Sequence, residues 1–577
     1  MIMPKKLEMI KTKMVNFKNK ISKNVIFDKI YNYEHLSTVT LSVVFLFFIS
    51  LVLFNGSSLR INSLKNAGEE NYYMSKYDSA IKYYNKIFTS TRDPQVAAKI
   101  ADIYSIKGDK EKSKEYVEKA KEMKNLNSES YNYIIFDELI NGDYDLAAND
   151  GEKALDLYKG DRQLIKTMYA VYMAKGETKK AANMVNSFGT NLKTAYDTAE
   201  YARMLMISGK MDQGLDELRK AYDMDKDEYK IYDVLSQVSV YNKDELLEEV
   251  SKLSQANPSD PSYKMWMAKI YSLDKSTATD AKKILDTLDA DNMGKIEIKL
   301  IQAVVYQYNN DEAKADEIIK KIISENKNDY RILHTAGWFY LNNIKDYDKA
   351  LDYCRKSKAA NPDYTDNYGF LMPEILKARG QDYLSEPYFR TALQKEPYNY
   401  NIMLNTANYY MGLNNKEKAL QYYKLAAVVK SDDAELKYNM AIIYLTMKKD
   451  TEGIELLKSS IGIDDSNPKY HRTLGTVYYL SGKKQEALQE IRYAYNADQN
   501  DILTLNNAGC YYVTENYDVE RGLFNLTKAV QGIDKNTDAY TKETINANYK
   551  KIKKLSDDLK NSKVNDKLKV PELVLFY

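Results

Sequence analysis

Small residues recur at a fixed interval near the end of this chain. Ala419, Gly453 and Ala487 stand 34 residues apart. Four residues after each comes a bulky apolar side chain, and a small one follows three positions later: Tyr423, Leu457 and Ile491, then Ala426, Ser460 and Ala494. A constant period of this length is the signature of a repeat protein. It therefore predicts many copies of one small unit, rather than the roughly four domains that 577 residues would otherwise suggest.

The same register extends upstream. Twelve residues before each of those three positions stand Ala407, Ala441 and Gly475, and a tyrosine follows each after three residues. The small position recurs at Ala80, Ala147, Ala181, Gly214, Ala281, Ala315, Ala350 and Ser385. Glycine-containing turns separate many of the segments. Residues 64–531 thus contain about fourteen units of roughly 33 residues each.

This order of small residue, tyrosine, turn, alanine and bulky apolar residue resembles the tetratricopeptide repeat. Closing prolines at Pro258, Pro362 and Pro397 match the same motif. The resemblance implies an all-α fold, a right-handed α-solenoid of helix–turn–helix repeats. Small residues let the backbones approach where helices cross, and tyrosine and leucine fill the gaps between pairs. Stability then comes from the interfaces between neighbouring units.

Some segments fit the pattern less well. Units at 226–258 and 261–290 match poorly, and those around Gly337 and Gly509 carry about two extra residues. We expect the array to bend or change pitch there. Residues 532–577 follow the array, and the amphipathic stretch over 537–560 predicts a capping helix. The last ten residues, LKVPELVLFY, either pack over that cap or dock into a partner's groove, and we favour packing.

One uncharged apolar run precedes the array. Residues 36–54 hold nineteen residues without a charge, which as a helix span about 28 Å, close to the roughly 30 Å hydrocarbon core of a bilayer. Eight lysines and three acidic residues lie in the flank 1–35. A lysine excess of this kind keeps the N-terminus in the cytoplasm. The sequence predicts one transmembrane helix over 36–55 and an array outside the cytoplasmic membrane. A cleaved signal peptide and a buried core helix are the less favoured alternatives.

Composition leaves little room for reactive chemistry. The 84 basic and 82 acidic residues nearly balance, which disfavours nucleic-acid binding driven by charge. Two cysteines and three widely spaced histidines make neither a disulfide framework nor a metal site. Neither a phosphate-binding loop nor a nucleophile motif occurs. We therefore expect no enzyme activity and no cofactor. Many of the 52 tyrosines fall on the repeat's own aromatic positions.

In the family that the chain resembles, the first helix of each repeat lines a concave groove that binds peptides. One known use clamps a peptide's terminal carboxylate with asparagine and basic residues from three repeats. Asn408, Asn439 and Lys469 stand at three of the five clamp positions, and Arg472 is next to a fourth. Leu404 and Thr473 replace the remaining basic residues. The alternative is that these residues only order their repeats.

The sequence predicts a single-pass membrane protein that binds proteins or peptides as a scaffold or assembly factor. The other possibility is a structural subunit of a large envelope complex, such as a polysaccharide-export, motor or secretion apparatus. An enzyme whose catalytic domain lies within the irregular region 226–300 ranks last.

Overall fold

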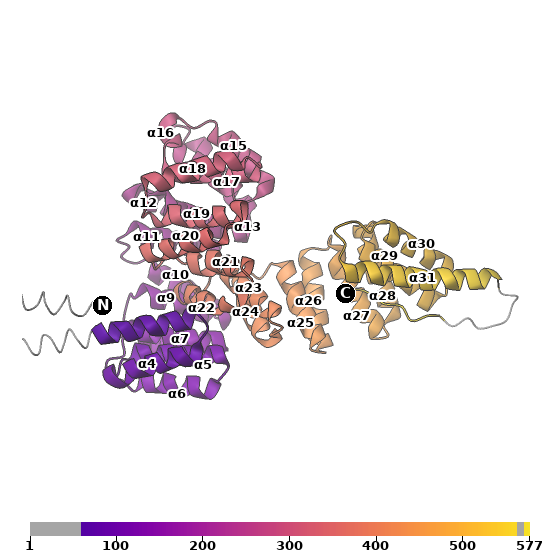
Figure 1. The fold of residues 1–577 in the computed structure, drawn as a ribbon, viewed down its shortest axis with the longest axis horizontal. Coiled ribbons are helices and arrows are strands. Elements are labelled where there is room, and N and C mark those ends of the chain that lie inside the picture. Colours follow the sequence, from indigo (N-terminus) through magenta and orange to yellow (C-terminus); the bar gives the residue numbers. More distant parts are fainter. Residues whose placement is uncertain (1–58, 562–569) are drawn as a thin grey trace, which may run out of the picture. The chain divides into compact units, whose positions relative to one another are not determined.

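The computed structural model describes residues 59–561 and 570–577 of the chain. They form two compact units, divided between Asn125 and Leu126. The regular structure of the described residues is helical, and no strand occurs among them (Figure 1). The expected basic flank 1–35 and membrane helix 36–55 lie outside the described residues. Within the residues that are described, no helix has both the length and the apolar character needed to cross a bilayer.

The first unit contains a helical stretch over 59–73, followed by α4 (Tyr77–Thr91), α5 (Pro94–Lys107) and α6 (Lys110–Lys121). Asp93 caps α5, where its carboxylate accepts a hydrogen bond from the backbone N–H of Gln95 (2.9 Å). Gly108 ends the helix in the left-handed conformation, with φ at 78°. Glycine adopts this conformation without steric cost, so the chain turns sharply into α6.

The second unit begins with regular pairs and passes into a less regular middle section. Its first helices are α7 (Ser128–Asn141), α8 (Tyr144–Leu157), α9 (Arg162–Ala174), α10 (Thr178–Phe188), α11 (Ala195–Ile207) and α12 (Met211–Asp225). The middle section consists of α13 (Glu228–Ala256), α14 (Pro261–Tyr271), η1 (Lys275–Thr277), α15 (Ala278–Leu285), α16 (Ala290–Met293), α17 (Ile296–Tyr308), α18 (Glu312–Glu325), α19 (Tyr330–Phe339), η2 (Tyr340–Ile344) and α20 (Tyr347–Ala360).

Regular pairs return towards the C-terminus. The remaining elements are η3 (Asn367–Leu371), α21 (Met372–Ala378), η4 (Asp382–Leu384), α22 (Glu386–Lys395), α23 (Tyr400–Gly412), α24 (Lys416–Val429), α25 (Ala434–Thr446), α26 (Asp450–Ile463), α27 (Pro468–Leu480), α28 (Lys484–Ala497), α29 (Ile502–Asn516), α30 (Val519–Gln531) and α31 (Ala539–Asn561). The capping helix expected over 537–560 corresponds to α31, and residues 570–577 follow it.

The small residues that revealed the repeat lie in the packed interior. All eleven predicted small positions are buried: Ala80, Ala147, Ala181, Gly214, Ala281, Ala315, Ala350, Ser385, Ala419, Gly453 and Ala487. At Gly453 an added Cβ would lie 2.7 Å from the Leu445 side chain, which is too close for a carbon contact. The all-helical solenoid predicted from the spacing is therefore confirmed, and the pairs are as tightly packed as the small residues require.

The fold departs from regular pairs in the segments where the pattern weakens. In α13 two helices merge across Asn242, whose backbone is non-helical (φ −154°, ψ 86°). The extra residues near Gly337 are accommodated in the π-helical turn η2, directly after α19. Near Gly509 the helix α29 has 15 residues and ends at Tyr517, which is left-handed with φ at 54°. A π-helical turn is the usual way for a helix to hold an inserted residue.

Helices that are far apart in sequence meet within the second unit. α22 packs against α7, and α24 packs against α9. Arg390 on α22 forms an ion pair with Asp137 on α7 at 2.9 Å, and both side chains are buried. The stack of helix pairs therefore winds round until a later stretch contacts an earlier one.

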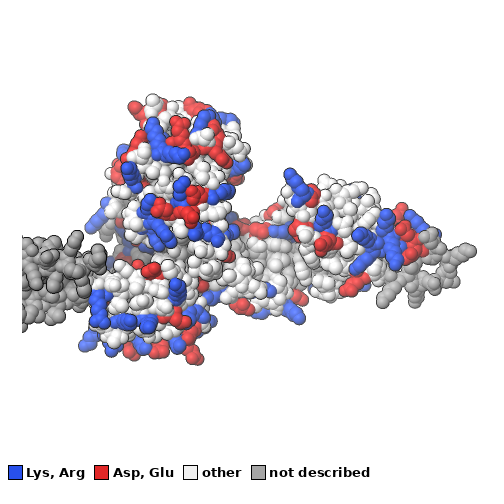
Figure 2. Space-filling view, in the orientation of Figure 1, with Lys and Arg blue, Asp and Glu red and all other residues white. Residues whose placement is uncertain are grey.

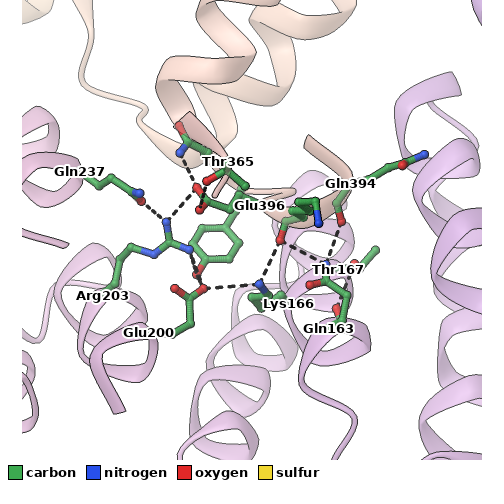
Figure 3. Close-up of polar contacts among 12 residues, drawn as sticks. Gln163, Lys166, Thr167, Glu200, Arg203, Gln237, Thr365, Gln394 and Glu396 are labelled. Carbon is green, nitrogen blue, oxygen red and sulfur yellow. Dashed lines mark hydrogen bonds and ion pairs between the residues drawn. The ribbon is translucent and has the colours of Figure 1, made fainter. Parts of the chain in front are cut away.

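A second set of polar contacts joins the same stretches, as Figure 3 shows. The guanidinium of Arg203 on α11 contacts the carboxylates of Glu200 (2.5 Å) and Glu396 (3.1 Å). It also donates a hydrogen bond to the hydroxyl of Tyr398 (3.0 Å). All four side chains are buried. Glu396 and Tyr398 belong to the connection between α22 and α23, so Arg203 holds that connection against α11.

Helix α9 contributes further donors to this contact. Lys166 donates to the carbonyl of Lys395 (3.0 Å), and Gln163 donates to that of Gln394 (2.8 Å). Burial lowers the pKa of the Lys166 ammonium, although the nearby Glu200 opposes this. Burial by itself would raise the pKa of Glu200, but Arg203 and Lys166 bring it below its usual value. The charges of this network thus stabilise one another in an interior where any single one would be costly.

Replacing Arg203 by methionine is expected to destabilise the second unit by about 3–5 kcal/mol, because Glu200 and Glu396 would lose the cation that compensates them. The exposed Arg355 has no ion pair among the described residues, and its replacement by methionine should change stability by less than about 0.5 kcal/mol. Urea unfolding followed by circular dichroism measures both. Equal midpoints for the two variants would contradict a stabilising role of the Arg203 network.

Candidate peptide-binding groove

The first helix of the second-to-last pair, α27, packs against that of the last pair, α29, and α29 packs against α31 (Figure 1). The surface of these three helices that contacts residues 570–577 is called the groove below. Asn467 caps α27 by accepting from the N–H of Lys469 (3.1 Å), and Pro468 occupies its first turn. α29 lies close to α30, since a Cβ added at Gly522 would lie 2.8 Å from the carbonyl oxygen of Gly509.

Residues 570–577 of the chain lie in this groove as an extended segment without regular structure. Asn507 on α29 accepts from the backbone N–H of Phe576 (2.8 Å) and donates to its carbonyl (2.7 Å). Asn548 on α31 binds Val574 in the same way: it accepts from the N–H of Val574 (3.1 Å) and donates to its carbonyl (2.8 Å). Two carboxamides therefore hold both backbone groups of two alternate residues.

Other side chains add to this backbone recognition. Asn506 donates to the carbonyl of Val574 (3.0 Å), and Thr476 on α27 donates to that of Phe576 (2.7 Å). Lys551 donates to the carbonyl of Glu572 (2.7 Å). The bonded residues 572, 574 and 576 are two apart, which is the period of an extended chain. Since these contacts involve backbone atoms only, they depend little on the sequence of the segment, apart from excluding proline at 574 and 576.

Apolar contacts select the side chains of the segment. Phe576 is buried in a cluster with Leu505, Ala529 and Ile545. Leu573 packs on a second cluster that contains Ile552 and three other buried side chains of α29, α30 and α31. The segment therefore packs against the capping helix, as we favoured from the sequence, and it does so inside the chain's own groove. An arrangement that holds a peptide backbone and accepts two apolar side chains is suited to binding extended peptides.

The four residues predicted to clamp a peptide have different neighbours in the structure. Arg472 lies beside the tail, with Nε 3.4 Å from the carbonyl oxygen of Tyr577, and it also pairs with Asp501. Lys469 is bound by Glu435 at 2.7 Å. Asn408 accepts from the hydroxyl of Tyr423 (2.5 Å) and borders a different hollow, formed with α21 and α22.

Asn439 on α25 has no hydrogen bond to another described residue through its side chain and is partly exposed. Both basic groups of the predicted clamp are neutralised by carboxylates, so a peptide carboxylate would have to compete with Glu435 and Asp501. Binding by Asn408, Asn439, Lys469 and Arg472 stays a prediction.

Sequence analysis missed the asparagines that hold the tail. Asn506 and Asn507 lie one repeat after Thr476, and Asn548 lies on the capping helix. Adjacent asparagines buried on a first helix were the available signal, because a buried carboxamide needs partners for its donors and its acceptor. Those partners come from residues 574 and 576, whose position relative to α29 only the folded chain defines.

Both cysteines, Cys354 and Cys510, are buried. Burial raises the pKa of each thiol to about 12. Cys354 contacts the carbonyl of Asn367 (3.8 Å), whereas Cys510 lies beneath the tail, 3.8 Å from the carbonyl of Val574. Cys510 therefore reports on the presence of the tail.

Comparison with protein families matches residues 94–125, which contain α5 and α6, to the tetratricopeptide repeat. A search of curated proteins finds no match. Solved structures similar to the chain include the Cut9–Hcn1 hetero-tetramer of the APC/C, at 13% identity over 85% of this chain and 96% of that one, with a TM-score of 0.37.

Yeast Tom70 is similar at 17% identity over 82% of this chain and 96% of that one, with a TM-score of 0.34. Pseudomonas aeruginosa PilF is similar at 14% identity over 38% of this chain and 96% of that one, with a TM-score of 0.32. The family comparison thus agrees with the tetratricopeptide repeat that the residue spacing predicted.

Replacing Asn548 by alanine is expected to loosen the tail, because the N–H of Val574 loses its acceptor and the carbonyl of Val574 keeps only the donor from Asn506. Alkylation of Cys510 by a maleimide should then accelerate at least about tenfold, as expected if roughly 1.4 kcal/mol or more of tail binding is lost. Asn546 lies two residues away on α31 and bonds only to Lys542 of its own helix, so Asn546→Ala is the matched control. Cys354 measures general unfolding in the same mass spectra. Unchanged Cys510 reactivity in Asn548→Ala would show that these bonds do not hold the tail.

Proposed function

We propose that this chain is a membrane-anchored scaffold that binds extended segments of partner proteins in the groove of α27, α29 and α31. The observation that carries the proposal is the tail itself, held through both backbone groups of Val574 and Phe576. A groove that recognises a backbone at every second residue accepts other extended segments with apolar side chains at matching positions. The proposed binding surface continues towards the preceding repeats and includes three residues of the predicted clamp, Asn439, Lys469 and Arg472.

The tail would then compete with partners for the groove. A tethered segment has an effective concentration in the millimolar range, so it lowers the affinity of a free competitor without abolishing it. Partner segments that bind more tightly than residues 570–577 would displace them. When no partner is bound, the tail would occupy the groove and keep its apolar surface covered.

The anchor rests on the sequence alone. The uncharged residues 36–54 and the lysine-rich flank 1–35 support a single span with a cytoplasmic N-terminus and an extracytoplasmic array. On the face shown in Figure 2, basic and acidic side chains of the described residues are interspersed. This pattern matches the near balance of 84 basic and 82 acidic residues and provides no large field of one sign for a polyanion.

A chain lacking residues 570–577 is expected to bind a fluorescent peptide VPELVLFY, whereas the full-length chain should bind it at least about tenfold more weakly because its own tail competes. Fluorescence anisotropy in detergent measures both. A peptide with proline at the position of Val574 should bind poorly, since it cannot donate to Asn548, while alanine there should change affinity by less than about threefold. Absence of binding to the shortened chain would mean that the tail is only part of the cap.

The proposed topology is tested with protease added to intact spheroplasts that carry the chain with an N-terminal epitope tag. The array should be digested from outside, while the tag stays protected until the membrane is lysed. Digestion of the tag in intact spheroplasts, or protection of the array, would overturn the proposed orientation. In detergent, a megadalton particle in place of a small oligomer would favour the structural subunit of an envelope complex.

A further inference from the structure

A cavity of about 430 Å³ lies in the middle section of the second unit, away from the peptide groove. Its walls come from α13, α14, α17 and α19, together with residues that precede η3. These elements belong to the irregular section, where the merged helix α13 and the turn η2 replace regular pairs. The volume is within the range of pockets that hold small ligands or single side chains.

Two carboxylates face this cavity from different elements. Asp233 belongs to α13, and Asp366 directly precedes η3. Asp366 accepts a hydrogen bond from the hydroxyl of Tyr364 (3.1 Å), whereas Asp233 has no hydrogen bond through its side chain to another described residue. Neither carboxylate forms an ion pair within the part of the chain that the structure describes. Unpaired carboxylates in a recess are costly and attract a cation.

The other charged groups around the cavity compensate these carboxylates only in part, since the charges of Lys269 and Arg203 oppose the rise in their pKa without overcoming it. Lys269 on α14 faces the same space but forms no ion pair with a described residue, and burial lowers the pKa of its ammonium. Glu297 on α17 is paired with Arg331 on α19 (3.1 Å). Arg203 and Glu396 act on the carboxylates from the neighbouring network, where they pair with each other. The groups without an ion pair are therefore the carboxyl groups of Asp233 and Asp366 and the ammonium of Lys269. When all three are ionised, negative charge is in excess.

The imidazole of His334 is engaged in the wall rather than available to a ligand. Its Nε2 accepts from the indole N–H of Trp338 (3.1 Å), and its Nδ1 donates to Asn367 Oδ1 (3.0 Å). The amide of Asn367 in turn donates to Ser357 Oγ (2.9 Å). Burial lowers the pKa of His334 to about 4, so it stays neutral. This chain of hydrogen bonds orients Trp338 at the cavity wall.

Aromatic rings complete the wall. Tyr229 and Tyr364 line the cavity, their hydroxyls are 3.2 Å apart, and both rings pack against Tyr330. Tyr232 also lines it, and its hydroxyl is buried without a hydrogen-bond partner among the described residues. A buried hydroxyl without a partner is rare in proteins and indicates a place for a further polar group. Aromatic faces beside carboxylates are the surroundings that organic cations prefer.

We propose that this cavity binds an organic cation, a primary ammonium or a guanidinium, with Asp233 and Asp366 as counter-ions and Tyr229 and Trp338 as the aromatic walls. The cation belongs either to a free amine or to a lysine or arginine side chain of a partner protein. This site is separate from the groove of α27, α29 and α31, so a negative result for one proposal does not affect the other.

The proposal implies a direction of pH dependence. Burial, with the negative charge of Glu396, raises the pKa of Asp366 to about 6, and burial with the charge of Asp366 raises that of Asp233. A raised pKa means that the empty site holds protons at mildly acidic pH. A cation binds the ionised carboxylates and displaces those protons, so affinity rises as pH increases through about 6 and falls below it.

The test uses the full-length chain in detergent and its own tryptophans. The chain contains two, and Trp338 lines the cavity while Trp266 is fully buried elsewhere. Butylammonium and butylguanidinium should change the fluorescence of Trp338 in a saturable way, and neutral butanol should not. Affinity should fall at least about fourfold between pH 7.5 and pH 5.5, the change expected from protonation of Asp366 alone. Replacement of Trp338 by phenylalanine should remove the signal, and calorimetry then follows binding.

Three variants make the outcome specific. Asp233→Asn should weaken butylammonium binding at least about tenfold, whereas Asp244→Asn, an exposed residue of α13 beyond the break at Asn242, should have no effect. Lys269→Met should strengthen binding, a gain that misfolding cannot produce. No binding of either cation, or tighter binding of butyrate than of butylammonium, would overturn the proposal. Tighter binding of an end-blocked Gly-Gly-Lys-Gly-Gly peptide than of butylammonium would assign the cation to a partner protein, and equal or weaker binding to a free amine.

Discussion

The close crossing of paired helices at small residues is the constraint on which the rest of this structure depends. At Gly453 and Gly522 the neighbouring helix is so near that a methyl group would collide with it. Distances of this kind determine how each pair packs and therefore where the next pair begins. Since every pair contacts mainly its neighbours, the direction of the stack accumulates from many such crossings. Contacts between helices that are distant in sequence therefore depend on this accumulated direction.

The contact between distant stretches of the second unit is a consequence of this winding. Arg203, Glu396 and Tyr398 come from segments about 195 residues apart in sequence, yet they share one buried network. Such a network contributes less to net stability than its many bonds suggest, because its charges must be desolvated. The network matters for geometry, because its bonds form only in one relative position of α11 and the connection that precedes α23. The cavity beside it, with Asp233 and Asp366, depends on the same arrangement.

The two proposed binding sites differ in their kind of recognition. In the C-terminal groove, carboxamides bind backbone groups and apolar pockets receive Phe576, so the groove is permissive about sequence. In the cavity, the carboxylates without an ion pair and the oriented rings would select a cation. The groove would bind many extended segments with low specificity, and the cavity would bind one cationic group specifically. A scaffold with both features would combine broad contact area with a chemically specific point.

The sequence by itself determined the repeating unit, because a steric requirement for small residues recurs with the period of a helix pair and is visible in one dimension. Gaps in the same pattern located the irregular segments at 226–290 and near Gly337 and Gly509, and an amphipathic stretch located the capping helix. The predicted clamp at Asn408, Asn439, Lys469 and Arg472 stays a prediction, and the structure adds the neighbours of its members, Tyr423 beside Asn408 and Tyr577 beside Arg472. Only the tertiary structure decided that Asn507 and Asn548 hold the tail and that Asp233 meets Asp366. Such contacts depend on directions summed over many helix crossings, which no local pattern of residues specifies.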